Sequence, residues 1–255
     1  MTRVIKVGGR PQLDASLPRT LAAAHRAAPG SLVVVHGGGD EVSTLQRLYG
    51  AVAEFKGGRR VTSVLDLEII RMALSGSANK RLVSALVAEG VPALGLSGED
   101  AALISAAPLD PSQYGYVGVP AEVNVGLLQH LVAGGYVPVL SPVSRCTDVN
   151  EGLTLNVNGD DAARAIAIAL EAEELLFVTD VAGVLVDGVP VSALALEDAQ
   201  RLIDDGTAQG GMSAKLQAAL AALEGGVERV RISDIAAIER LDRGTVLTRV
   251  GSVYA

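Results

Sequence analysis

Short apolar runs alternate with longer segments of mixed polarity along most of this chain. The runs are rich in β-branched residues, as in Val4–Val7, Leu32–Val35 and Leu175–Val178, which is typical of buried strands. Between such runs the apolar residues recur at helical spacing, for example from Leu65 to Glu89. This alternation predicts an α/β fold, a three-layer α/β/α sandwich with a mostly parallel central sheet and β-hairpin insertions.

Glycine, proline and capping residues set the expected boundaries of the elements. Strands are expected at 4–9, 31–36, 91–97, 136–141, 175–180 and 229–232, and helices at 16–28, 40–49, 65–89, 122–133, 161–170, 196–204 and 210–224. Hairpins are predicted at 101–119, 143–157 and 184–191, inserted at the end of the sheet where a ligand is expected to bind. Residues 51–62 are interpreted as an irregular basic loop, and Gly76–Ser77 as a kink or break in a helix.

Three consecutive glycines, Gly37–Gly39, stand between the second predicted strand and the helix that begins at Asp40. Glycine lets the backbone approach a ligand closely, and free amides beside a helix N-terminus attract anions. A glycine triplet also suits a plain turn between strand and helix. The triplet alone therefore leaves both interpretations open, and the rest of the chain has to decide between them.

Two lysines next to glycines favour the anion site. Lys6 lies at the end of the first strand, and Lys215 is expected in the first turn of a helix that begins with Gly210–Gly211. A lysine in a buried strand is costly unless it meets an anion, and a cation in a first helical turn opposes the helix dipole. Both suit a polyphosphate and a phosphoryl-transfer transition state, with Asp160 placed to hold them. Both residues also have an alternative interpretation without a ligand. Lys215 could simply lie along the surface of its helix, and Asp160 could simply cap the helix that it begins.

Composition and charge narrow the classes of function. A net charge of −8 over 255 residues argues against nucleic acid as the main partner, although residues 1–60 carry nine Lys/Arg against four Asp/Glu. No apolar run is long enough to span a membrane, and no signal peptide is expected. The single cysteine, Cys146, excludes an internal disulfide and a cysteine metal cluster, so a reduced, cytoplasmic compartment is expected.

Several well-known catalytic motifs are absent from the sequence. There is no G-x-x-x-x-G-K-[ST] loop, H-R-D, D-F-G or G-x-S-x-G motif, and Val42 breaks a G-x-G-x-x-G match. The three histidines lack metal-ligand spacing, so no protein-bound metal is expected. His36 is interpreted as a hydrogen-bonded structural residue, with an acid–base role as the alternative. If the group that accepts the phosphoryl group is already a carboxylate, no base is needed to remove a proton from it.

Seven segments resemble, in order, the motifs of the amino acid kinase family, and within it those of the acetylglutamate kinases. They are Ile5–Gly9, Val35–Gly39, Gly58–Thr62, Ala78–Lys80, Leu155–Asp160, Thr179–Val184 and Gly210–Lys215. Each segment is weak evidence alone, but the ordered set covers nearly the whole chain. The resemblance implies a cytoplasmic enzyme of arginine biosynthesis. It would use ATP with Mg²⁺ to phosphorylate the γ-carboxylate of N-acetyl-L-glutamate to N-acetylglutamyl 5-phosphate.

The resemblance also assigns roles to individual residues. Lys6 and Lys215 would stabilise the transferring phosphoryl group, with Asp160 orienting both. The acceptor would be bound by Gly38, Arg60 and Asn156, with Arg60 pairing with its α-carboxylate. The nucleotide and its phosphates would be bound by Gly9, Gly39, Asp180, Val181, Gly183, Leu185, Thr207 and Gln209. The Mg²⁺ would ride on the phosphates, and a soft boundary near residue 170 would separate an acceptor and phosphoryl lobe (1–170) from a nucleotide lobe (171–255) of one continuous domain.

Several residues depart from the family pattern. Arg10 follows the first glycine pair, Asp40 follows the triplet, Arg59 stands beside Arg60, and Gly159 replaces a usual alanine. Because Arg10 and Arg59 are expected near the acceptor, a larger or more anionic acyl group such as succinyl stays an alternative. So do another amino-acid acceptor and a catalytically silent nucleotide or amino-acid sensor. By the resemblance, a chain that starts at its first strand is expected to form a homodimer that arginine does not inhibit.

Overall fold

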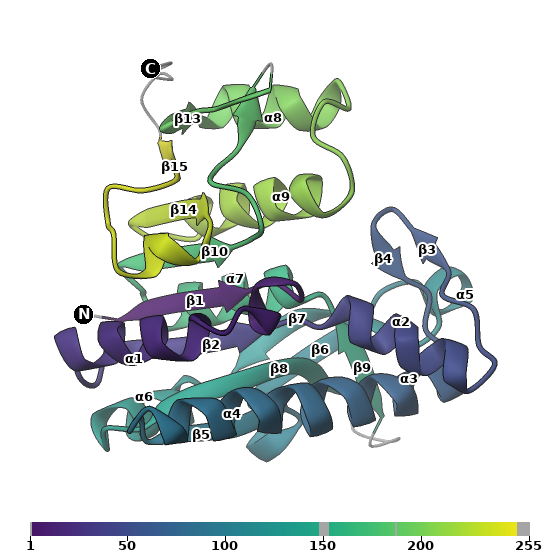
Figure 1. The fold of residues 1–255 in the computed structure, drawn as a ribbon. Helices are drawn as coiled ribbons and strands as arrows, with labels where there is room; N and C mark the ends of the chain where they lie inside the picture. Colours follow the sequence, from purple (N-terminus) through teal and green to yellow (C-terminus); the bar gives the residue numbers. More distant parts are fainter. Residues whose placement is uncertain (1, 148–152, 187, 249–255) are drawn as a thin grey trace.

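A computed structural model describes residues 2–147, 153–186 and 188–248. An eleven-stranded sheet runs through the molecule, and helices lie on both of its faces (Figure 1). The strand order is β13-β15-β14-β10-β1-β2-β8-β6-β7-β9, with β5 also paired to β8. The predicted α/β class with a largely parallel central sheet is confirmed.

The bounds of the elements follow the expected ones closely. The strands are β1 (Arg3–Val7), β2 (Leu32–His36), β3 (Phe55–Lys56), β4 (Arg59–Arg60), β5 (Ala93–Gly98), β6 (Ile104–Pro108), β7 (Val117–Val123), β8 (Val137–Cys146), β9 (Thr154–Val157), β10 (Glu174–Val178), β11 (Leu185–Val186), β12 (Val189–Pro190), β13 (Ala193–Ala195), β14 (Arg229–Ser233) and β15 (Thr245–Thr248). The α-helices are α1 (Leu17–Ala27), α2 (Gly39–Leu48), α3 (Val64–Ile70), α4 (Asn79–Ala88), α5 (Pro111–Tyr114), α6 (Val125–Ala133), α7 (Gly159–Ala169), α8 (Leu196–Asp204) and α9 (Gly210–Glu224).

The centre of the sheet is parallel and buried on both faces. Strand β1 pairs in parallel with β2 and with β10. Alternation along β1 sends Val4 into the core cluster under α7 and α9, and Ile5 and Val7 into the cluster under α1 and α4. Lys6 shares the face of Val4 and therefore points toward α7. The carboxyl ends of β1, β2 and β10 lie at one edge of the sheet, which is the edge where open α/β sheets bind ligands.

The hairpin insertions are largely as expected. Strands β6 and β7 form the antiparallel hairpin predicted at 101–119, with α5 in its connection. Strands β8 and β9 are antiparallel, and β11 and β12 form the small hairpin expected at 184–191. The turn predicted near 150–152 and Asp187 of the small hairpin lie outside the described residues.

Two segments differ from the sequence prediction. Residues 51–62 were expected to be irregular, but they contain the β3–β4 hairpin, which turns at Gly57–Gly58, both with positive φ. Two-residue strands that carry Lys and Arg are too short for alternation to reveal them. The expected break at Gly76–Ser77 is a π-helical segment, Arg71–Ala78, which joins α3 to α4 without interruption. Wider π turns absorb the glycine and serine while the helix continues.

One smaller prediction was also wrong, and two short strands were missed. Ser16 precedes α1, but its hydroxyl does not cap the helix; it donates to Asp14 Oδ1 at 2.7 Å. The short strands β13, at the edge of the sheet, and β15, beside it, were not predicted because they carried no recognisable pattern in the sequence. Among the described residues, none of the helices is both long and apolar enough to cross a membrane.

Candidate active site

Three charged side chains from distant parts of the chain meet at the carboxyl edge of the sheet. Lys6 comes from β1, Asp160 from the first turn of α7, and Lys215 from α9. Lys6 Nζ lies 2.7 Å from Asp160 Oδ1, and Lys215 Nζ lies 3.4 Å from Asp160 Oδ2. Asp160 therefore bridges the two ammonium groups, as the sequence suggested it would.

This Lys6–Asp160–Lys215 cluster is buried and carries a net charge of +1. Lys6 is 6% exposed and Asp160 is 4% exposed, so neither charge could stand there unpaired. Burial raises the pKa of Asp160, but the two lysines more than offset it, and the net pKa is below its usual value. Burial and the nearby Lys6 lower the pKa of Lys215, while Asp160 opposes them. The surplus positive charge is available to an anion.

Two local details differ from the expectation. Lys215 lies in the second turn of α9 and not the first, and its ammonium also reaches back to the Gly211 carbonyl at 3.4 Å. Asp160 does not cap α7, because that position belongs to Asn158, whose Oδ1 accepts from the Asp160 amide at 2.8 Å. The Asp160 carboxylate is thereby left for the lysines.

The glycine triplet meets the first glycine pair at the same edge. A Cβ on Gly9 would lie 3.4 Å from the Gly38 Cα and 3.5 Å from the Gly39 amide nitrogen, so the two loops touch. Gly38 has a φ of +151°, and a Cβ there would stand 2.7 Å from Leu74 in the π-helical segment. The position of Gly38 requires glycine, whereas a side chain at Gly9 would meet only ordinary van der Waals contacts.

Two cavities meet at these loops, and they share Gly9 and Gly39. The first, which we call the acceptor cavity, has a volume of about 220 Å³. Its wall includes Lys6, Gly38, Arg59, Arg60, Asn156 and Asn158. The second, which we call the outer cavity, has a volume of about 530 Å³. Its wall includes Arg10, Asp40, Asp180, Val181, Met212 and Lys215. One lysine of the cluster thus faces each cavity.

Arg60 is fixed in the acceptor cavity by a dense set of contacts. It donates to the Gly39 carbonyl at 3.1 Å and to Ser43 Oγ at 2.9 Å, it contacts Gln46, and its guanidinium stacks 4.6 Å from the centroid of the Phe55 ring. Burial lowers the pKa of Arg60, which nevertheless remains a cation. No carboxylate forms an ion pair with it among the described residues. Its charge is therefore available to a ligand.

Asn156 lies on the facing side of this cavity. Its Nδ2 donates to Thr62 Oγ1 at 3.0 Å, and Thr62 in turn donates to the Arg60 carbonyl at 2.9 Å. Thr62, two residues after Arg60 in the chain, therefore holds the side-chain amide of Asn156. The residues predicted to bind the acceptor, Gly38, Arg60 and Asn156, therefore line one cavity.

The residues predicted to bind the nucleotide are only partly brought together. Asp180 and Val181 line the outer cavity with Lys215. Of the described residues that line either cavity, none is one of the remaining four predicted residues, Gly183, Leu185, Thr207 and Gln209. Gly183 instead packs against Thr245, whose Oγ1 would lie 2.6 Å from a Cβ at that position. Their assignment stays a prediction.

His36 is a structural residue, as interpreted from the sequence. Its Nδ1 lies 2.9 Å from the Gly37 carbonyl, and its Nε2 lies 3.1 Å from Asn79 Nδ2. A carbonyl can only accept, so Nδ1 carries the proton and Nε2 accepts from Asn79. Burial lowers the pKa of His36 to about 4, so the ring is neutral at pH 7. Through its hydrogen bond to the Gly37 carbonyl, the ring helps to hold the glycine triplet in place.

Sequence reasoning missed the partners that position the site. Arg10 was expected near the acceptor, but it lines the outer cavity instead, where it lies 3.0 Å from Asp180 Oδ2 and 3.6 Å from Asp40 Oδ2. Phe55 and Gln46 hold Arg60, yet neither stood out in the sequence. An aromatic residue just before a basic hairpin was the available signal for Phe55.

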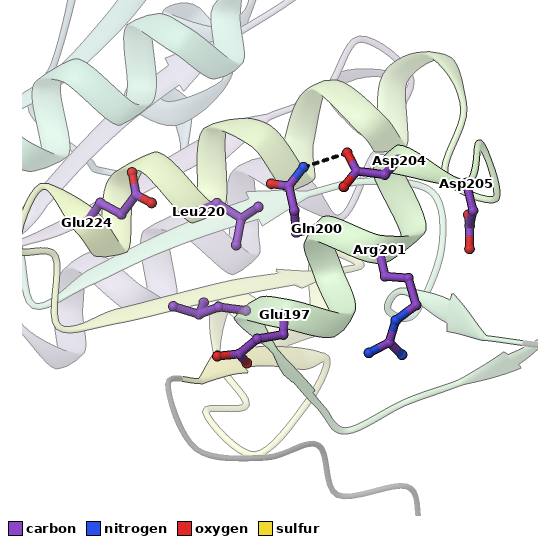
Figure 2. Close-up of a pocket in the computed structure, with 8 residues that line it drawn as sticks. Glu197, Gln200, Arg201, Asp204, Asp205, Leu220 and Glu224 are labelled. Carbon is purple, nitrogen blue, oxygen red and sulfur yellow. Dashed lines mark hydrogen bonds between the residues drawn. The ribbon is translucent and has the colours of Figure 1, made fainter.

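A further cavity, of about 690 Å³, lies between α8 and α9, away from the glycine loops (Figure 2). Its wall carries Glu197, Asp204, Asp205 and Glu224 but only one cation, Arg201. Two of its polar side chains are already paired, since Gln200 donates to Asp204 at 2.8 Å. A surface of this charge repels a polyphosphate, so the candidate site is the pair of cavities around Gly9 and Gly39.

Among residues 2–147, 153–186 and 188–248, no three His, Cys, Asp or Glu side chains are grouped closely enough to hold a metal ion.

Comparison with known proteins gives consistent matches. The model of the amino acid kinase family matches residues 1–234. The acetylglutamate kinase of Chloroflexus aurantiacus is 44% identical over 247 residues, covering 96% of each chain. That of Geobacillus stearothermophilus is 43% identical over 233 residues, covering 91% of this chain and 89% of the relative.

Two solved structures superpose on nearly the whole of this chain. A protein of Streptococcus mutans superposes with a TM-score of 0.87 at 30% identity, covering 98% of this chain and 99% of its own. The carbamate kinase of Giardia lamblia bound to AMP-PNP has a TM-score of 0.75 at 17% identity, covering 98% of each chain, which shows the shared fold alone.

Proposed function

Since this chain belongs to the amino acid kinase family, we propose that it transfers the γ-phosphoryl group of ATP to the side-chain carboxylate of N-acetyl-L-glutamate. The observation that carries the proposal is the Lys6–Asp160–Lys215 cluster, which lies between two cavities that share Gly9 and Gly39. Two substrates that approach from opposite sides would meet at that junction. The named relatives, at 43–44% identity over most of the chain, support the same acceptor.

For this reaction the protein has to hold the two substrates in position and to supply positive charge near the transferring phosphoryl group. An oxygen of the acceptor carboxylate forms a bond to the γ-phosphorus, and the bond from that phosphorus to the β,γ-bridging oxygen breaks, which releases ADP. Lys6 and Lys215 neutralise the charge that spreads over the transferring group, and the Gly9 and Gly39 amides donate to its oxygens. Asp160 keeps the two ammonium groups apart and in place. The carboxylate is already ionised, so no general base is required.

The remaining assignments belong to the same proposal. The acceptor lies in the acceptor cavity, with its α-carboxylate on Arg60, and the nucleotide lies against residues 171–255. Mg²⁺ would be held by the phosphates of ATP and would supply charge neutralisation there. We also propose that the protein is a cytoplasmic homodimer and that it serves arginine biosynthesis, the pathway that the name of its relatives implies.

Turnover tests the proposal directly. Purified protein is incubated with MgATP and N-acetyl-L-glutamate, ADP release is measured, and the acyl phosphate is trapped with hydroxylamine. We expect ADP and hydroxamate in equal amounts. Calorimetric binding of both ligands without ADP release would instead favour a silent sensor on the same fold.

The role of Lys215 gives a sharper test. Lys215→Ala should lower kcat about 10²–10³-fold, because it removes one charge from the transition state. Asp160 keeps its closer partner Lys6, so the variant should still fold. Lys56→Ala is the matched control, since Lys56 is exposed and lines neither cavity. A Lys215→Ala enzyme with near wild-type kcat would remove this residue from the mechanism.

A further inference from the structure

The β3–β4 hairpin carries Arg60, the proposed partner of the acceptor's α-carboxylate, yet its backbone belongs to no larger sheet. In the part of the chain that the structure describes, its two strands, Phe55–Lys56 and Arg59–Arg60, pair only with each other. An isolated two-stranded hairpin is marginally stable at best in water. Contacts from its side chains to neighbouring elements therefore decide where the hairpin lies.

Arg60 attaches one side of the hairpin to α2. It donates to the Gly39 carbonyl at 3.1 Å and to Ser43 Oγ at 2.9 Å. Phe55, the residue opposite Arg60 in the hairpin register, stacks on its guanidinium. These contacts fix the hairpin to the glycine triplet, and its other side has to be held separately.

Arg59 attaches that other side to α7. Alternation along β4 sends Arg60 toward α2 and Arg59 toward α7, where Arg59 Nη2 lies 2.7 Å from Asp161 Oδ2. The Arg59 side chain is 25% exposed and that of Asp161 is 16% exposed, so water and salt screen the pair only in part. Arg164, one turn further along α7, lies 4.0 Å from Asp161 Oδ1 and reinforces the carboxylate from within its own helix.

The first turn of α7 thus carries two carboxylates with different partners. Asp160 bridges Lys6 and Lys215, and Asp161 holds the hairpin. The acceptor has to reach from Arg60, at its α-carboxylate, to Lys6, at its reacting carboxylate. The position of the hairpin relative to α7 therefore decides whether both ends of the acceptor are bound at once.

We propose that Arg59 is a positioning residue, which through its ion pair with Asp161 holds the β3–β4 hairpin at the distance from α7 that N-acetyl-L-glutamate requires. The inference rests on the proposed function for the place of the acceptor. Arg59 needs no group of the ligand in this role, because its partner is Asp161. The phosphoryl transfer itself is unchanged.

A double-mutant cycle measures the pair through the acceptor. Arg59→Gln, Asp161→Asn and the double variant are compared with wild type by steady-state kinetics, with N-acetyl-L-glutamate and MgATP varied in turn. We expect each single variant to raise the KM of the acceptor about tenfold and the KM of MgATP less than about twofold, because only the acceptor depends on the hairpin. The double variant should lie close to the single variants and not at the product of their effects, since the two side chains act as one pair.

The conservative variant Arg59→Lys separates the ion pair from the exact shape of the side chain. It keeps the cation and should retain most of the acceptor affinity, because the contact is made through one nitrogen, and a lysine ammonium can supply that. Two control variants each remove a cation that does not join the hairpin to α7. Lys56→Gln removes the residue opposite Arg59 in the hairpin, and Arg164→Gln removes the other partner of Asp161. Both should keep the acceptor KM within about twofold of wild type.

Loss of folded protein cannot imitate the expected result. It would lower the apparent kcat and leave both KM values unchanged, whereas a displaced hairpin raises the KM of the acceptor alone. Arg59→Gln leaves Asp161 with Arg164 and should fold, which thermal unfolding would verify. If it does not fold, the double variant removes both charges of the pair and provides the KM in its place.

Three results would overturn the inference. They are an acceptor KM within about twofold of wild type in the variants of the pair, independent effects that multiply in the double variant, and an equal rise of KM in Arg164→Gln. Each would show that the pair does not hold the hairpin for the acceptor.

Calorimetric Kd values for N-acetyl-L-glutamate keep failure of this inference apart from failure of the proposed function. Turnover by wild type with an unchanged acceptor KM in Arg59→Gln and Asp161→Asn sinks the positioning role alone. Binding that weakens in both variants, without ADP release by wild type, keeps the positioning role and sinks the kinase activity. Wild-type protein that binds no N-acetyl-L-glutamate overturns both.

Discussion

At the scale of single residues, two aspartates in one helical turn organise the site. Asp160 holds Lys6 and Lys215, and Asp161 holds Arg59 and Arg164. Both carboxylates stand in the first turn of α7, where the helix dipole favours negative charge. Because Asn158 caps the helix, neither aspartate is needed for capping, and both are free to arrange cations.

His36 gives a prediction about stability and pH. Its pKa is about 4 in the folded protein, against an ordinary value of 6.5. Below pH 6.5 the unfolded chain takes up a proton that the folded protein refuses, so stability falls as the pH decreases from about 6.5 to about 4. The free energy of unfolding should drop by about 2 kcal/mol between pH 7 and pH 5, as measured by urea denaturation.

His36→Gln provides the comparison for that measurement. The variant loses stability at pH 7, because the buried contacts to Gly37 and Asn79 are disturbed, but the difference between pH 7 and pH 5 should largely vanish. An unchanged difference in the variant would show that other groups produce the pH dependence.

At the scale of elements, a helix with a π-helical centre supports the glycine triplet. The segment Arg71–Ala78 brings Leu74 against Gly38, and Ser75 contacts Ser141 at 2.7 Å. π-Helical turns often accompany functional sites, and here the widened turns place side chains directly under the loop between the two cavities.

Gly38→Ala tests this contact. Its φ of +151° and the 2.7 Å approach of an added Cβ to Leu74 together force the loop to move. We expect KM for the acceptor to rise about tenfold or more, since small displacements of a positioning loop are costly for catalysis. Steady-state kinetics with varied N-acetyl-L-glutamate would measure it.

Gly90→Ala is the matched control for that variant. Gly90 also has positive φ, at +80°, but a Cβ there would meet nothing within 4 Å. It should lower stability by about 1 kcal/mol through backbone strain and leave KM unchanged. An acceptor KM that is equally unaffected in Gly38→Ala would contradict the proposed role of the triplet.

At the scale of the whole molecule, a buried ion cluster joins the first strand to the last third of the chain. Glu174 on β10 accepts from Arg231 on β14 at 2.5 Å and from Arg3 on β1 at 2.8 Å. Arg231 has no exposure, and it also donates to the carbonyls of Ala237, Arg240 and Arg243. The cluster holds three neighbouring strands in register, far from the substrates.

Glu174→Leu should therefore destabilise the whole molecule. It strands the Arg231 cation in the core, and breaking one side of a buried ion pair costs about 3–5 kcal/mol. Denaturation should show one transition shifted by that amount. The double variant Glu174→Leu/Arg231→Met removes both charges and should be more stable than the single variant. A single-variant loss below about 1 kcal/mol would mean that water reaches Arg231.

The sequence by itself determined the class of fold and nearly all the main strands and helices, and it named Lys6, Asp160 and Lys215, which the structure brings together, as candidate site residues. These predictions depend on signals that are local in the sequence. The signals are the spacing of the apolar residues, lysines that stand next to glycines, and an aspartate at the start of a helix. Lys6 and Lys215 could be named because a lysine is unusual in their surroundings, and Asp160 because a carboxylate at that helix start could lie between them. The β3–β4 hairpin was not predicted, because strands of two residues are too short to show an alternation of apolar and polar residues.

Only the tertiary structure decided which charges pair. Arg59 and Asp161 are about a hundred positions apart, and their contact depends on how a short hairpin meets the first turn of α7. The same holds for Arg10 with Asp180 and for Glu174 with Arg231. Ion pairs form between side chains that are close in space, and spatial distance depends on how the sheet orders its strands. For that reason the sequence could name the cations of the acceptor cavity, but only the fold showed that one of them, Arg59, pairs with Asp161.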